Sequence, residues 1–98
     1  MAKFINLWER DESKWPTDPR ERAEISGKLM EMTKKLLAEG KISDWGQFAS
    51  GRGGYVMAEG TAMDILKMQM LFAPYIISHV HHVLSLDEMA EAMKSMKG

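Results

Sequence analysis

Residues 42–59 read ISDWGQFASGRGGYVMAE, and this stretch decides the fold. Two segments of β-favouring side chains, 42–50 and 55–59, flank a turn at 51–54 that holds three glycines. Two such segments joined by a glycine-containing turn predict a β-hairpin. The turn does not open a helix, so it is a poor phosphate cradle. The architecture therefore depends on what precedes and follows the hairpin.

A helix is predicted on each side of this hairpin. Before it, Asp18 is a suitable N-cap and Pro19 suits the first helical position. After it, Thr61 and Asp64 form a capping box, and Pro74 ends the second helix. The first helix repeats apolar side chains at the spacing of a face that packs on a core. These side chains are Ile25, Leu29, Met32 and Leu36.

Strands are predicted at residues 3–9 and 76–84, followed by a C-terminal helix at about 86–97. The order β-α-β-β-α-β with an added helix is typical of the α+β class and of a ferredoxin-like fold. Such a fold has an antiparallel sheet with its first two helices on one face. A chain of 98 residues is long enough for one domain, so residues 1–98 are predicted to form a single unit.

The composition excludes several kinds of function. The formal net charge is −1 and no basic stripe is present, so nucleic acid is not an expected partner. The absence of cysteine excludes disulfides, thiolate catalysis and cysteine zinc sites. No apolar run approaches the roughly 20 residues that span a bilayer, so a membrane is not an expected partner. The N-terminus has no signal-peptide pattern, which predicts a cytoplasmic location.

Ten methionines are a high number for this length. The methionine side chain is unbranched and flexible, so it fills irregular gaps in a core. The same flexibility suits an adaptable interface between subunits. We give gap filling the greater weight and keep the interface as the alternative.

The alternation of side chains along the strands predicts two unlike sheet faces. The face expected beneath the helices carries plain aliphatic side chains: Ile5, Leu7, Val56, Ala58, Val80 and Leu84. The opposite face is aromatic with a few polar groups: Phe4, Asn6, Trp8, Tyr55, Met57, Glu59, Ile77, His79, His81 and Val83. Since the first, third and fourth strands are neighbours in this fold, the second face is expected to form one surface. Apolar surfaces with few convergent polar groups are typical of small-molecule sites.

The three histidines are residues 79, 81 and 82, and strand alternation places only His79 and His81 on the same face. Three roles are open for this pair. The side chains could be hydrogen-bonded in a dimer interface, transfer protons to a substrate, or bind a metal together with Glu59. The predicted site uses His79 and His81 as acid and base without a metal, and Asn6 to hold a carbonyl or oxyanion.

The remaining predicted site residues would bind the substrate. They are Trp8, Arg52, Tyr55 and Glu59. Trp8 and Tyr55 offer aromatic surface, and Arg52 at the hairpin turn would reach an anion. Burial of Glu59 beside Trp8 would raise its pKa and make it a second base.

Four segments resemble the muconolactone isomerase family of dimeric α+β barrel proteins. They are Leu36–Gly40, Trp45, Gly54–Met57 and Leu71–Ile76, and the resemblance spans about residues 19–83. It implies a homodimer whose sheets pack into a barrel, with residues 1–98 as one dimeric barrel domain. It also implies proton transfer on a small lactone without a metal or organic cofactor. The first strand lacks the basic residues of that family, so muconolactone itself is not the expected substrate.

The sequence therefore predicts a small cytoplasmic protein that binds a small organic acid in a barrel cavity. The predicted activity is an isomerase-like proton transfer that needs no cofactor. The alternative is a non-catalytic ligand-binding protein or a structural homo-oligomer with the histidines in its interface. The expected partners are a second copy of the chain and a small-molecule ligand.

Overall fold

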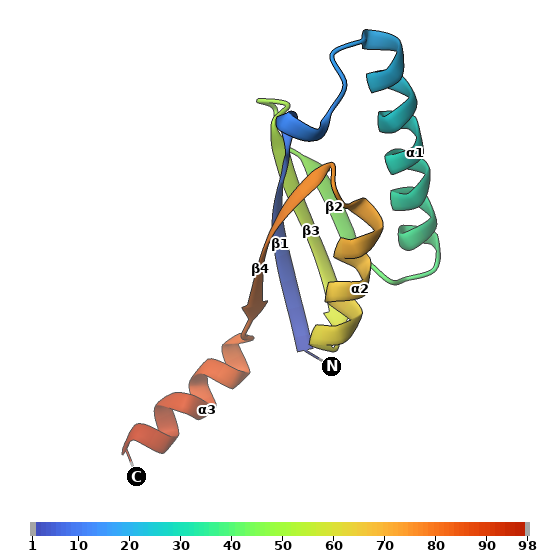
Figure 1. The fold of residues 1–98 in the computed structure, drawn as a ribbon. Coiled ribbons are helices and arrows are strands. Elements are labelled where there is room, and N and C mark those ends of the chain that lie inside the picture. The colour runs from blue at the N-terminus through green and yellow to red at the C-terminus, as the bar shows by residue number, and fades with distance from the viewer. Residues whose placement is uncertain (1, 98) are drawn as a thin grey trace.

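The computed structural model describes residues 2–97 and contains one antiparallel sheet of four strands and three α-helices (Figure 1). The strands are β1 (Ala2–Arg10), β2 (Asp44–Gln47), β3 (Gly53–Gly60) and β4 (Ile76–Val83). The helices are α1 (Pro19–Ala38), α2 (Ala62–Phe72) and α3 (Leu86–Lys97), and a 3-10 turn, η1, spans Glu12–Lys14. Within residues 2–97, no helix is both long and apolar enough to span a membrane.

The strands lie in the order β2-β3-β1-β4, and each neighbouring pair is antiparallel. Helices α1 and α2 lie on the same side of the sheet, whereas α3 extends away from the end of β4 (Figure 1). The α+β class and the antiparallel sheet are confirmed, and the topology is compatible with a ferredoxin-like fold. We call the face toward α1 and α2 the helix side, and the other face the open face.

Local side-chain hydrogen bonds start the helices where the sequence predicts. The Asp18 carboxylate accepts from the Arg20 backbone N–H at 3.3 Å, with Pro19 at the first helical position. Thr61 and Asp64 form the predicted capping box of α2, with bonds of 3.1 and 3.0 Å. The backbone N–H of Thr61 donates to the Asp64 carboxylate, which lowers the pKa of Asp64 below its usual value.

Strand β2 is shorter than predicted. It ends at Gln47 and pairs only with β3, so Phe48 lies beyond the ladder and is exposed. Strand β3 is longer than predicted, because it begins at Gly53 within the glycine-rich segment. The early start of β3 follows from Gly53 and Gly54, which take extended backbone and pair with Glu9 and Trp8 of β1.

The predicted facing of β1 is wrong. Asn6 lies opposite Val56 on β3 and opposite Val80 on β4, and paired residues of neighbouring strands share a face. Phe4, Asn6 and Trp8 therefore lie on the helix side, and Ile5 and Leu7 on the open face. Predicting this from β1 alone failed because both of its faces carry bulky side chains. The space between the sheet and the helices holds Phe4, Asn6 and Trp8, which include the larger aromatic side chains.

Glycine on β3 makes room for the largest of these side chains. A Cβ atom on Gly54 would lie 2.6 Å from Cζ2 of Trp8, far inside van der Waals contact. The Trp8 indole therefore lies flat over the Gly54 backbone. Its ring stacks on Trp45 of β2 with centroids 5.8 Å apart and an interplanar angle of 19°. Two stacked indoles thus cover this part of the sheet on the helix side.

The buried core is small. Its central cluster consists of Leu36, Ile42, Ala58 and Ile65, with half-buried apolar side chains around it, and Trp8 and Trp15 are buried outside this cluster. The backbone carbonyl of Leu36 accepts from the N–H of Lys41 at 2.9 Å, which fixes the end of α1 beside the core. The predicted apolar face of α1 does turn inward, since Ile25, Leu29 and Met32 are half-buried and Leu36 is buried. The core occupies only one end of the space beneath α1.

Candidate functional site

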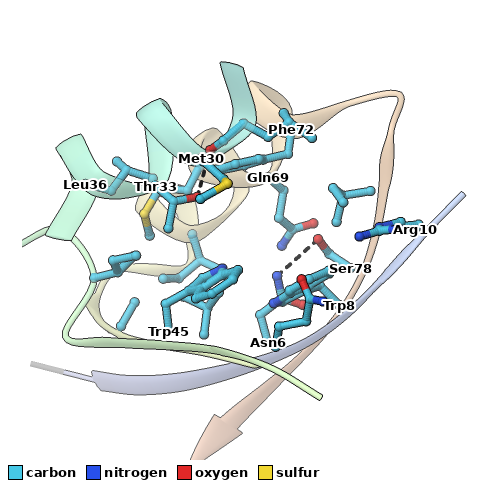
Figure 2. A pocket seen from close by; sticks show the side chains of 18 of the residues that line it. Asn6, Trp8, Arg10, Met30, Thr33, Leu36, Trp45, Gln69, Phe72 and Ser78 are labelled. Carbon is cyan, nitrogen blue, oxygen red and sulfur yellow. Dashed lines mark hydrogen bonds between the residues drawn. The ribbon is translucent and has the colours of Figure 1, made fainter. Parts of the chain in front are cut away.

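A cavity of about 230 Å³ lies between the helix side of the sheet and helices α1 and α2 (Figure 2). Its walls are mainly apolar and include Phe4, Trp8, Leu36, Ile42, Trp45 and Phe72. Met30 and Gln47 also line it and are exposed, so the cavity reaches the surface. A concave apolar space with a few polar groups is the usual form of a small-molecule site.

All three tryptophans of the chain line this cavity. Trp8 and Trp45 contribute the stacked pair described above. Trp15 follows η1 and is buried, and its indole Nε1 donates to the backbone carbonyl of Tyr75 at 2.9 Å. That bond joins the segment after β1 to the segment before β4, so the indole of Trp15 is held in a fixed place at the end of the cavity.

One group of polar side chains lies on the sheet floor of the cavity. The Asn6 Nδ2 donates to Ser78 Oγ at 3.1 Å, and Asn6 Oδ1 accepts from the His79 backbone N–H at 3.0 Å. Asn6 is therefore held in place from β4 on both sides of its amide. In Figure 2 the carboxamide of Gln69 extends from α2 toward Asn6 and Ser78. These side chains provide hydrogen-bond donors and acceptors without formal charge.

Arg10 is the charged member of the cavity wall. Its guanidinium lies 5.5 Å from the centroid of the Trp15 ring, which is within range for a cation–π contact. Arg22 of α1 also lies over Trp15, at 5.3 Å, but it has a carboxylate partner in Glu12 at 3.1 Å. Among residues 2–97, no carboxylate lies within ion-pair distance of the Arg10 guanidinium. Arg10 therefore presents a cation to the cavity without a partner of opposite charge.

The predicted site residues divide between the two faces of the sheet. Asn6 and Trp8 line the cavity, whereas His79 and His81 lie on the open face, opposite Leu7 and Ile5 of β1. The expected single surface holding all four is therefore wrong. The cause is the facing of β1, which places its even-numbered side chains beneath the helices.

The remaining predicted substrate-binding residues also lie outside the cavity. Tyr55 is on the open face, where its ring lies over Gly46, and its hydroxyl donates to the Asp44 carboxylate at 2.8 Å. That hydrogen bond, together with partial burial, raises the pKa of Tyr55 above its usual value. Glu59 lies near the end of β3, opposite Lys3. Arg52 is exposed in the turn, and its backbone carbonyl accepts from the Arg10 N–H at 3.1 Å.

The histidines do not form a metal-binding set with Glu59. His79 Nε2 lies 3.7 Å from the Glu9 carboxylate, at the exposed surface. His82 is on the helix side, as expected from alternation, and stacks on Phe4 with centroids 5.0 Å apart. In the part of the chain that the structure describes, no three His, Cys, Asp or Glu side chains come together as metal ligands would.

Arg10, Trp15, Trp45, Gln69 and Ser78 are among the cavity residues that were not predicted as site residues. Extending the even-numbered alternation of Phe4, Asn6 and Trp8 by one step would have found Arg10. Nothing in the sequence around Trp15 indicates its place, because that depends on the backbone of Tyr75, 60 residues away.

Comparison with known proteins found no family model that matches the chain and no curated protein that matches it. The antiparallel α+β fold is compatible with many activities, because folds of this kind serve unrelated functions. The cavity and the open face are therefore the features of this protein that bear on its function.

Proposed function

We propose that the protein binds a small organic acid with an apolar body in the cavity beneath α1 and α2. The observation that supports this most strongly is the guanidinium of Arg10, which has no carboxylate partner among residues 2–97 and lies in a mainly apolar wall. Arg10 is half-buried, and partial removal of a cation from water is costly unless an anion or strong acceptors satisfy it. A ligand carboxylate would supply that partner, and arginine binds carboxylates in a bidentate geometry.

The size and shape of the cavity favour a ligand with one ring. An apolar cavity of about 150 Å³ is known to hold benzene, so about 230 Å³ accommodates a ring with a carboxylate and one further substituent. The stacked indoles of Trp8 and Trp45 offer a flat surface for such a ring. The amides of Asn6 and Gln69 would bind a polar substituent on the ligand.

The proposal is for binding without catalysis in this cavity. Proton transfer needs a side chain that gains and loses a proton near neutral pH within hydrogen-bond reach of the substrate. Of the side chains that line the cavity, only that of Arg10 is ionisable, and arginine stays protonated. His79 and His81 lie on the opposite face of the sheet. The geometry thus favours the ligand-binding alternative over an isomerase.

Replacing Arg10 with methionine is expected to weaken benzoate binding at least about tenfold, because a hydrogen bond to a charged group contributes roughly 1.5–3 kcal/mol. Binding is measured by NMR from the indole N–H signals of the three tryptophans, all of which line the cavity. Benzamide, which has the same ring without the charge, is expected to bind the wild type more weakly than benzoate. Its affinity should not change in the Arg10→Met variant.

The matched control is Arg52→Met, since Arg52 is exposed and its side chain is not part of the cavity wall. This variant should bind benzoate as the wild type does. Equal affinity of the wild type for benzoate and benzamide would show that the cavity does not select a carboxylate. Unchanged benzoate binding by the Arg10→Met variant would contradict the role given to Arg10.

We also propose that the open face binds the open face of a second copy, as a sheet-on-sheet homodimer. The apolar side chains of this face are Ile5, Leu7, Tyr55, Met57, Ile77 and Val83. Leu7 and Ile77 are 39% and 37% exposed, although both lie within the paired ladder of β1 and β4. A sheet face with this much apolar surface is normally covered by another layer. His79 and His81 would lie within the resulting interface.

Replacing Leu7 with glutamate is expected to raise the dimer dissociation constant by about 30-fold or more, since an unpaired charge would be buried between the sheets. Light scattering over a dilution series gives this constant. The control is Leu37→Glu on α1, because Leu37 is 41% exposed and thus closely matched to Leu7. A monomeric wild type, or equal effects of the two variants, would contradict the proposed interface.

A further inference from the structure

Helix α3 exposes a row of apolar side chains to solvent. It follows β4 directly and lies apart from the rest of the protein (Figure 1). Leu86 and Met96 at its two ends are 85% and 88% exposed, and Met89 and Met93 between them are 51% and 53% exposed. These exposed fractions show that the described part of this chain does not cover the row. We call these four side chains the α3 seam.

The spacing of the seam is that of a helix that pairs with another helix. Its members follow one another at intervals of three, four and three residues, which is the a/d pattern of a coiled coil. A seam this narrow differs from the wider apolar face of a helix that packs on a sheet. The two residues beside it, Ala90 and Ala92, are small, so a second helix can approach closely.

Within residues 86–96, the charged side chains of α3 lie away from the seam. At 100° per residue, Glu91 falls on the side opposite the seam, and Asp87, Glu88 and Lys94 lie between these two sides. A helix pairing through the seam would therefore bury none of these four charges. The start of α3 is also well formed, because Ser85 and Glu88 make a capping box with bonds of 3.1 and 3.0 Å.

We infer that α3 pairs with α3 of a second copy of this chain through the seam. A surface that meets itself about a two-fold axis must be complementary to itself. The seam meets this condition, because it places leucine and methionine against leucine and methionine, and the charged residues within 86–96 lie away from it. Methionine is flexible enough to pack against its own copy without a matched cavity. This pairing would give Met89, Met93 and Met96 the role in a subunit interface that was the alternative to gap filling in the core.

The pairing of α3 rests on the proposed dimer of open faces, and it adds buried area to that dimer. An isolated helix of 12 residues is marginal in water, so the copies must be held together elsewhere. From standard strand dimensions, the open face covers only about 450 Å². Stable dimers bury about 800 Å² on each partner. The seam adds about 180 Å² from a helix about 18 Å long, which brings the area closer to that value.

Cysteine cross-linking tests the pairing, and the chain has no cysteine of its own. The seam variants are Met89→Cys and Met93→Cys, oxidised separately and as a mixture, and the control is Glu91→Cys on the opposite side of α3. A disulfide needs Cα atoms about 4.4–6.8 Å apart. Parallel helices are expected to link each seam variant with itself, and antiparallel helices to link the two variants in the mixture. In either case the disulfide-linked fraction on a non-reducing gel should be at least fivefold larger for the seam variants than for the control.

The masses of the same variants under reducing conditions separate the two proposals. A dimer mass with no more linking at the seam than at Glu91→Cys would overturn the pairing of α3 and leave the open-face dimer in place. A monomer mass for the wild type would overturn both. A dimer mass with linking confined to the seam variants supports the pairing.

Discussion

Replacing Gly54 with alanine is expected to lower the free energy of unfolding by about 3 kcal/mol or more, which is a large part of the roughly 5–15 kcal/mol that stabilises a typical domain. The new methyl group would overlap the carbonyl oxygen of Gly46 and approach Cζ2 of Trp8 within 2.6 Å. The Gly46 oxygen belongs to the backbone of the neighbouring strand, so it cannot move without breaking the β2-β3 ladder. The Trp8 indole would have to leave its stack on Trp45.

The control is the same substitution at Gly27. A Cβ atom on Gly27 meets nothing within 4 Å, and this glycine lies inside α1. Gly27→Ala is therefore expected to stabilise the protein by roughly 0.5–1 kcal/mol, since alanine is favoured in a helix. Urea denaturation followed by circular dichroism measures both changes. Similar stabilities of the Gly54→Ala variant and the wild type would show that Trp8 does not lie against the β3 backbone.

Replacing Leu36 with alanine is expected to lower the free energy of unfolding by about 2–5 kcal/mol. Leu36 is 6% exposed and packs with Ile42, Ala58 and Ile65, which are the other members of the core cluster. Removing three carbons from a core this small enlarges the cavity beside it and releases the end of α1. Thermal or urea unfolding gives the change directly.

The adjacent leucine is the matched control for this variant. Leu37 is 41% exposed, so Leu37→Ala is expected to change the free energy of unfolding by less than about 1 kcal/mol. The two variants differ by one position along the same helix and have the same composition. Equal destabilisation by the two variants would mean that the sheet-facing side of α1 does not pack on the core.

The order of elements could be predicted because the signals for it are local. Asp18 with Pro19, and Thr61 with Asp64, start helices through bonds to residues within three positions of each other. The facing of β1 is not a local property. Its two sides carry comparable bulk, and the choice between them depends on the bare backbone of Gly54 on another strand. A pattern within one strand does not contain that information.

The site was predicted only in part for the same reason. Asn6 and Trp8 both line the cavity, but from the helix side of the sheet and not from the face on which they were expected. His79 and His81 were predicted to share a face with Asn6 and Trp8. The register of β1 and β4 places them on the opposite face, beside Leu7 and Ile5. The place of Trp15 depends on a contact with Tyr75, which no spacing in the sequence reveals.

The small core has a consequence for the level of the protein in a cell. Four buried side chains lie at one end of the space beneath α1, and the cavity occupies much of what a larger core would fill. A ligand bound there would complete the packing, and at 100 times its dissociation constant it would stabilise the folded state by about 2.7 kcal/mol. Since cellular proteases remove unfolded chains, the abundance of this protein would rise and fall with the concentration of its ligand.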